Sequence, residues 1–293
     1  MRKTPPPPDP IAIEETICDR LAYADDVDLL GETFVARDRH VSTFRRKGKR
    51  VGLETSEGKT KAMEVGRGKR DIDFADVGGM MIEVVDSFKY LGSIMTGDNT
   101  IDKEIDTRIA NANKTYWALK DIFRSRNVTR STKLLTYTTI VRPIATYAAE
   151  TWTLTKAQER RLEIFENTIL RRIYGPIYDE EEQTWRLRHN EELRALSRLP
   201  LITAFIRAAR LRWAGHVARM GEDAPCKKYL FGRHEGRRPV GRPRLRWGDL
   251  IVSDLRHLGV EHPEQWPRVA QDRRQWRGLV TAAKDQRRLQ PRE

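Results

Sequence analysis

The chain has 293 residues, of which 39% are hydrophobic and 33% charged, a composition typical of globular proteins and unlike that of disordered ones. Its 55 Lys and Arg against 42 Asp and Glu give a formal net charge of +13, which favours polyanionic partners: nucleic acid first, an acidic membrane surface second. Cys18 and Cys226 are too few for a disulfide framework or a four-cysteine zinc site. No apolar stretch approaches the roughly 20 residues of a membrane span, so we expect a soluble, intracellular protein, nuclear or cytoplasmic.

The N-terminal third is expected to form a small α+β unit after a proline-rich tail at 1–19. Apolar residues on both sides of Tyr23-Ala24-Asp25-Asp26 predict two short strands joined by a tight acidic turn. A helix is predicted at about 33–50, where it would cover one face of a sheet. Short apolar runs rich in β-branched or aromatic residues predict strands at 62–65, 80–85 and 88–95.

After residue 97 the spacing of apolar residues becomes helical. Thr129 is a candidate N-cap, and Thr155 with Gln158 matches a capping box whose helix should end at Gly175. Asn190 is a candidate cap for the next helix.

A further helix is predicted over 202–217, with Arg207 and Arg210 away from its apolar stripe. A Gly-, Pro- and Arg-rich linker should follow, and then two basic helices, the last of them holding Val269, Trp276 and Val280. The predicted segments are the tail 1–19, the α+β unit 20–97, a helical domain 98–176, a basic helical segment 177–220, the linker 221–246 and basic helices 247–293.

Asp25 and Asp26 are the candidate metal ligands. Buried strands can fix the backbone at a turn while adjacent carboxylates project from its tip toward a divalent cation. Paired aspartates also occur in ordinary turns, so the pair alone does not decide between the two.

The order of motifs after this pair resembles the second half of the palm domain in reverse transcriptases of non-LTR (LINE-like) retrotransposons. The phrases that carry the resemblance to the palm are Tyr23-Ala24-Asp25-Asp26, Gly52-Leu53, Gly58-Lys59-Thr60-Lys61 and Phe88-Lys89-Tyr90-Leu91-Gly92. Those that resemble the thumb and C-terminal region are Tyr147-Ala148-Ala149-Glu150-Thr151-Trp152, Leu211-Arg212-Trp213-Ala214-Gly215-His216-Val217, Gly241-Arg242-Pro243 and Asp272-Arg273-Arg274-Gln275-Trp276-Arg277. The resemblance therefore runs from about residue 20 almost to the end.

The resemblance implies an RNA-directed DNA polymerase with RNA and DNA as partners and no membrane partner. Asp25 and Asp26 of the YADD motif would hold Mg²⁺, and Lys59 would lie near the phosphates of the incoming nucleotide. Tyr90, Leu91 and Gly92 would form the primer grip. For Lys59 the alternative is a solvated lysine after a glycine turn, and for Tyr90 and Leu91 it is packing in a strand.

Family polymerases also need an Asp on an earlier palm strand, and only 24 residues precede Asp25. We therefore expect the isolated chain, as a truncated enzyme, to be inactive as a polymerase. Ser56 is a smaller departure, since the family more often has Asn there.

Arginines in the predicted linker are candidate nucleic-acid contacts: Arg237, Arg238, Arg242 and Arg244. Their Gly-Arg-Pro setting partly resembles an AT-hook that enters the minor groove, and the alternative is a linker that contacts phosphates in general. Trp213, Trp247 and Trp276 are expected to pack in helical cores rather than stack on bases. His216, Cys226 and His234 match no zinc spacing.

The leading hypothesis is thus a truncated reverse-transcriptase domain with a small antiparallel palm remnant, a covering helix and a mostly α-helical thumb and C-terminal region. The alternative is a non-enzymatic, basic nucleic-acid-binding protein derived from such an element. A third possibility is a chain that folds poorly because palm strands are missing and sheet edges stay unpaired.

Overall fold

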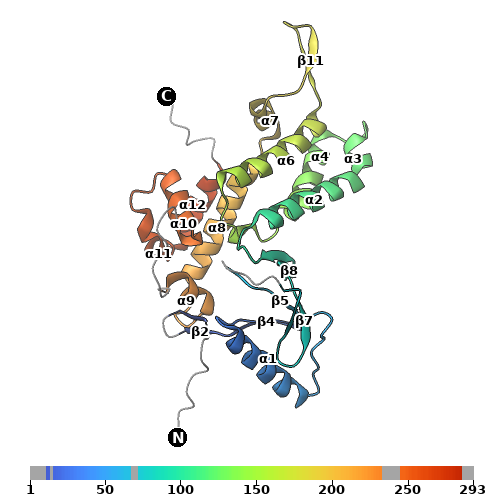
Figure 1. The fold of residues 1–293 in the computed structure, drawn as a ribbon. Helices are drawn as coiled ribbons and strands as arrows, with labels where there is room; N and C mark the ends of the chain where they lie inside the picture. The colour runs from blue at the N-terminus through green and yellow to red at the C-terminus, as the bar shows by residue number, and fades with distance from the viewer. Residues whose placement is uncertain (1–10, 14–15, 67–71, 233–244, 286–293) are drawn as a thin grey trace. The chain divides into compact units, whose positions relative to one another are not determined.

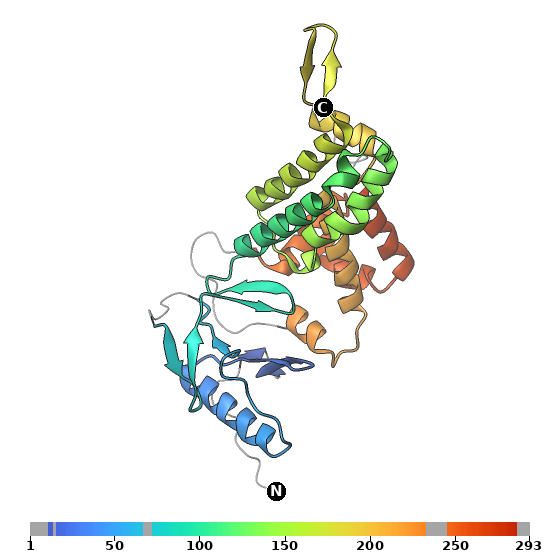
Figure 2. The same ribbon diagram turned by 90° about the vertical axis from the view of Figure 1, so that its right-hand side faces the viewer.

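The computed structural model describes residues 11–13, 16–66, 72–232 and 245–285, and it confirms the α+β class. The described residues belong to two compact units (Figures 1 and 2). The first, called here the mixed unit, draws on Met1–Thr100 and Gly221–Pro243, and the second, the helical unit, draws on Ile101–Met220 and Arg244–Glu293. Within the described ranges, no helix combines the length and apolar character needed to cross a bilayer.

The strands of the mixed unit form short sheets. The hairpins β1–β2, β3–β4 and β8–β9 are antiparallel, and in the sheet β5-β7-β6 the central strand pairs parallel with β5 and antiparallel with β6. The strands are β1 Ile11–Ile13, β2 Thr16–Cys18, β3 Arg20–Tyr23, β4 Asp26–Leu29, β5 Lys61–Ala62, β6 Phe74–Asp76, β7 Met81–Val84, β8 Ser87–Tyr90 and β9 Ser93–Thr96. The β1–β2 hairpin thus lies within the segment 1–19.

Helix α1 (Phe34–Lys49) confirms the helix expected over 33–50. Thr33 is its N-cap and accepts a hydrogen bond from the backbone N–H of Ala36. Val41 of this helix packs with Val77 and Ile82 in a small apolar cluster, so α1 covers the β5-β7-β6 sheet as expected. The turn between β6 and β7 approaches α1 closely at Gly78, which has a φ of +61° and whose missing side chain would lie 3.0 Å from Val41.

A short helix, α9 (Pro225–Phe231), lies inside the segment expected to be a linker. Burial and a hydrogen bond with the Cys18 thiol raise the pKa of Tyr229 in α9 to about 12. This contact ties α9 to β2 within the mixed unit.

The helical unit is built around α2, α6 and α8 (Figure 1). Its elements are α2 Asp102–Ala118, α3 Lys120–Arg124, α4 Arg130–Thr136, the π-helix Tyr137–Val141, α5 Arg142–Ala145, the 3₁₀ turn Ala149–Thr151, α6 Lys156–Tyr174, β10 Ile177–Asp179, β11 Thr184–Arg186, α7 Asn190–Ser197, α8 Ile202–Ala218, α10 Trp247–His257, the 3₁₀ turn Pro263–Gln265, α11 Trp266–Val269 and α12 Arg273–Lys284. The antiparallel hairpin β10–β11 projects beyond the end of α6 in both ribbon views.

Several helix boundaries in this unit match the sequence. Thr129 caps α4, and Thr155 with Gln158 forms the predicted capping box of α6, which ends at Gly175 with a φ of +73°. Asn190 was a wrong choice of cap. It is the first residue of α7, and the cap is His189, whose backbone N–H donates to Glu192 at 2.7 Å.

The core of the helical unit encloses a charged group. Glu166 of α6 is buried and accepts from the Tyr137 hydroxyl at 2.9 Å and from the backbone N–H of Ile202 at 2.8 Å, and Arg142 lies 3.5 Å away. Burial raises the pKa of Glu166, while Arg142 acts in the opposite direction. Fully buried apolar side chains surround the network: Ile105, Val141, Leu162, Ile169, Leu193, Ile202 and Ile206.

Helix α8 is buried around most of its circumference, and only Arg212, Trp213 and His216 are exposed. Arg207 and Arg210 are therefore not on solvent-facing sides, contrary to the expectation that they lie away from the core. Both donate to Asp254 of α10, at 3.0 and 2.8 Å. The correction has a simple cause, because α10 covers a second side of α8 that the spacing of α8 alone cannot reveal.

Replacing Asp254 with Asn should lower the free energy of unfolding by about 3–5 kcal/mol, because two buried guanidinium groups lose their counter-charge. Urea denaturation measures this loss. Glu261→Gln removes one negative charge from an exposed site and should change stability by less than about 0.5 kcal/mol. Equal effects of the two substitutions would contradict a structural role for the Asp254 ion pairs.

Candidate functional site

The acidic hairpin has the predicted form. Strands β3 and β4 pair with Tyr23 opposite Asp26, so Ala24 and Asp25 form a two-residue turn. Ala24 has a φ of +52°, and a positive φ at this position is a feature of the turns that match the twist of a hairpin. Asp25 is exposed in the turn, and Asp26 is exposed at the start of β4.

Asp28 is a third carboxylate of this hairpin that the sequence analysis did not select. Side chains two apart on a strand point to the same face, so Asp26 and Asp28 share a face of β4. Burial, followed by the charge of Asp26, raises the pKa of Asp28. The spacing Asp-Val-Asp within a strand was the available signal.

Tyr90 lies close to this acidic face. Burial raises the pKa of the Tyr90 hydroxyl, and the charges of Asp28 and Asp26 raise it further. The phenol therefore stays protonated near neutral pH and is a hydrogen-bond donor beside two carboxylates. The YADD hairpin and the tyrosine of the Tyr-Leu-Gly phrase thus meet within the mixed unit.

Leu91 and Gly92 form a turn and not part of a strand. The run at 88–95, expected as a single strand, reverses at these two residues, whose φ values are +46° and +86°. Positive φ at both central residues is typical of two-residue hairpin turns. Packing of Leu91 in a strand is therefore wrong, and its side chain is 41% exposed.

The other predicted site residues are not joined to the acidic hairpin. Lys59 is exposed in a turn in which its backbone N–H donates to Ser56, and in the described ranges no hydrogen bond or ion pair links it to Asp25 or Asp26. The four candidate arginines lie outside the described residues: Arg237, Arg238, Arg242 and Arg244.

The carboxylates suit Mg²⁺ in kind, since Mg²⁺ takes oxygen ligands and often uses one or two carboxylates together with waters and substrate phosphates. The raised pKa of Asp28 indicates that it feels the charge of Asp26, a repulsion that a cation would relieve. Across the described part of the chain, no group of three or more His, Cys, Asp or Glu side chains could hold a metal ion. Asp25 and Asp26 would therefore supply only part of a coordination shell.

Helices α8 and α12 form a basic face in the helical unit. Trp276 of α12 is buried and lies against Gly215 of α8, where any side chain would overlap the indole ring. The indole Nε1 donates to the carbonyl of Leu211 at 2.8 Å. This close approach fixes the spacing of the two helices and explains the glycine in Trp213-Ala214-Gly215-His216.

Of the three tryptophans expected in helical cores, Trp276 is buried as expected, at 3% exposure. Trp247 is half-buried and its Nε1 donates to the carbonyl of Glu150 at 2.7 Å. Trp213 is 37% exposed, so core packing is wrong for it. Val269 also departs from expectation, because it ends α11 and is separate from α12.

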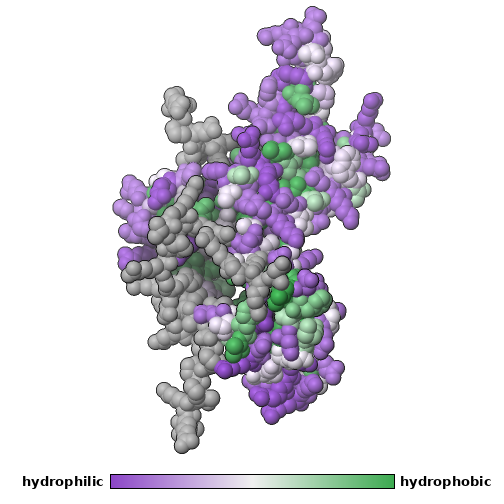
Figure 3. Space-filling view, viewed as in Figure 1, coloured by the Kyte–Doolittle hydropathy of each residue, from purple (hydrophilic) through white to green (hydrophobic). Residues whose placement is uncertain are grey.

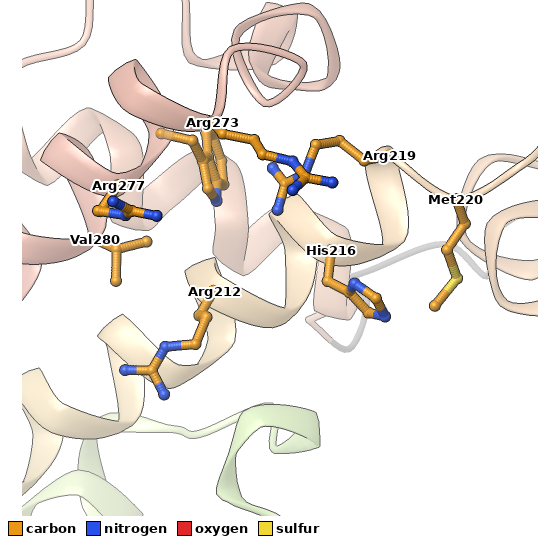
Figure 4. Close-up of a pocket in the computed structure, with 8 residues that line it drawn as sticks. Arg212, His216, Arg219, Met220, Arg273, Arg277 and Val280 are labelled. Atoms are coloured by element: carbon orange, nitrogen blue, oxygen red, sulfur yellow. The ribbon is translucent and has the colours of Figure 1, made fainter.

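A pocket of about 490 Å³ opens between these two helices (Figure 4). Its lining residues are Arg212, His216, Arg219 and Met220 at the α8 side and Arg273, Trp276, Arg277 and Val280 of α12. The sequence analysis missed this cluster. The signal was present in the four-residue spacing of two pairs, Arg212 with His216 and Arg273 with Arg277, which puts each pair on one helix face.

Gly215→Ala should destabilise the helical unit by about 1–3 kcal/mol, because the new methyl group overlaps the Trp276 indole. Gly278→Ala is the matched control in α12, where a methyl group meets no neighbour and should stabilise the helix by about 0.5–1 kcal/mol. Urea denaturation followed by circular dichroism measures both. A Gly215→Ala protein as stable as the Gly278→Ala protein would contradict the close packing.

Asp28→Asn should raise the melting temperature at neutral pH. The pKa of Asp28 in the folded chain is above its ordinary value of 3.8, so its ionisation costs stability as the pH rises through that range. Below that range both states are protonated and the advantage of the variant should disappear. The exposed Glu54→Gln is the charge-matched control, and an Asp28→Asn effect independent of pH would contradict the account.

Comparison with known proteins places the chain among transposon-related sequences. It is 28% identical over 274 residues to an uncharacterized transposon-derived protein of Caenorhabditis elegans, and the alignment covers 89% of this chain and 94% of that protein. No protein-family model matches the chain, and no solved structure matches it. The similarity supports a transposon-related origin for a chain that includes both units.

Proposed function

We propose that the chain is the reverse-transcriptase part of a non-LTR retrotransposon, in which the mixed unit is a palm remnant that binds Mg²⁺ and the helical unit binds nucleic acid. The observation that carries the proposal is the meeting of the Asp26 and Asp28 carboxylates with Tyr90 inside one unit. The order of motifs along the chain and the similarity to a transposon-derived protein support it.

In this proposal Asp25 and Asp26 hold Mg²⁺, and Asp28 reinforces the negative potential of the hairpin. When bound, Mg²⁺ would neutralise charge on the phosphates of an incoming nucleotide during DNA synthesis on an RNA template. Tyr90 would donate a hydrogen bond beside the carboxylates and help to fix their orientation. Lys59 would contact nucleotide phosphates, as the resemblance implies, once template and primer are bound.

The second candidate function is nucleic-acid binding without catalysis. It is favoured by the basic faces of α8 and α12, whose sequences contain no Asp or Glu. The described surface is mainly hydrophilic in the view of Figure 3, with separate hydrophobic patches. The same helices would hold primer and template in a polymerase, so both candidates share this interface.

Titration with MgCl₂, followed by residue-resolved NMR, tests the metal proposal. The amides of residues 24–28 should shift in a saturable way, because ligand carboxylates on a hairpin turn perturb their own backbone when they bind. Asp25→Asn with Asp26→Asn should abolish the shifts. The exposed turn at Glu180, Glu181 and Glu182 is an acidic control in the same chain and should shift only weakly and without saturation.

Equal behaviour of the two acidic turns would contradict a specific metal site. Primer extension separates the two candidate functions, since any Mg²⁺-dependent extension by a complex that contains this chain should disappear in Asp25→Ala. Extension that survives this substitution would overturn the assignment of the metal ligands.

A further inference from the structure

The pocket between α8 and α12 concentrates positive charge. Four guanidinium groups and one imidazole line it, from Arg212, Arg219, Arg273, Arg277 and His216. Neither α8 nor α12 contains an acidic residue. Like charges gathered in one concave site repel one another, and an anion in that site would relieve the repulsion.

The nearby carboxylates are engaged elsewhere. Asp272, the N-cap of α12, accepts hydrogen bonds from the backbone N–H groups of Arg274 and Gln275. Asp254 of α10 is buried between Arg207 and Arg210. In the described part of the chain, no ion pair is formed by any guanidinium group that lines the pocket.

The floor of the pocket is rigid and apolar. Trp276 and Val280 are buried, and Trp276 is held by its hydrogen bond to Leu211. Arg219 also donates to the carbonyl of Ala270 at 2.6 Å, which fixes the end of α8 to the segment before α12. The arginines at the rim thus project from a framework that should change little when a ligand binds.

We propose that this pocket binds the sugar-phosphate backbone of a nucleic-acid strand. Guanidinium groups present planar pairs of donors that match phosphate oxygens, and they remain charged at any physiological pH. A volume near 490 Å³ exceeds the needs of a single small anion and lies in the usual range for ligand pockets. The pocket contacts the backbone and not base edges, so binding should be independent of sequence.

The inference rests on the proposed nucleic-acid binding and goes further by assigning that binding to one site. It differs from the expectation for the arginine-rich segment 221–246. If both held, the two sites would contribute separately to affinity and could be removed separately.

The test measures binding of a short, mixed-sequence, single-stranded oligonucleotide by fluorescence anisotropy at salt concentrations from about 50 to 200 mM. The pocket variant carries Arg212→Gln and Arg277→Gln. The control variant carries Arg160→Gln and Arg256→Gln, which remove the same charge from exposed helix positions outside the pocket. All four side chains are exposed, so both variants should fold and melt like the wild type.

The pocket variant should lose affinity by about tenfold and its salt slope should fall by about 2, one for each lost phosphate contact. The control variant should change affinity by less than about twofold, because exposed charges at a distance are screened by salt. An oligonucleotide of different sequence should give the same result.

Equal losses in the two variants, or no loss in the pocket variant, would overturn the pocket assignment and leave nucleic-acid binding in place. A wild-type protein that binds no oligonucleotide would overturn both the nucleic-acid function and the inference. A polyglutamate peptide that competes as strongly as the oligonucleotide at equal charge would show that the pocket accepts any polyanion, and would overturn the proposed ligand.

Discussion

The contact between Trp276 and Gly215 sets the geometry of the C-terminal part of the helical unit. The indole fills the space that a side chain at position 215 would need, and its Nε1 is satisfied by the carbonyl of Leu211. Two helices rich in arginine can lie this close only because the contact between them is apolar and the charges stay at its rim. The packing that stabilises the unit therefore also creates its basic pocket.

The two units present opposite charge for different physical reasons. In the mixed unit, Asp26 and Asp28 share one face of a short strand, and Tyr90 of a neighbouring hairpin faces the same carboxylates. In the helical unit, buried arginines are neutralised by Asp254, and the remaining arginines collect around the pocket. An acidic face suited to a cation and a basic pocket suited to phosphates are both consistent with a chain of transposon-related origin that acts on nucleic acid.

Local signals in the sequence predicted what depends on neighbouring residues. Thr33, Thr129 and the Thr155–Gln158 pair mark helix starts through short-range hydrogen bonds, and the YADD hairpin follows from strand alternation around a turn. Long-range packing could not be predicted in this way. Burial of Arg207 and Arg210 depends on α10, more than 40 residues later, and the pocket depends on α12, more than 55 residues after α8 begins.

The measurement that most directly tests the account is a residue-resolved NMR titration of the full chain with a single-stranded oligonucleotide. The account predicts that the largest shifts fall in α8 and α12 near Arg212, His216, Arg273 and Arg277, including the indole N–H of Trp276, and that salt reverses them. Shifts confined to other elements, with these two helices unchanged, would contradict it.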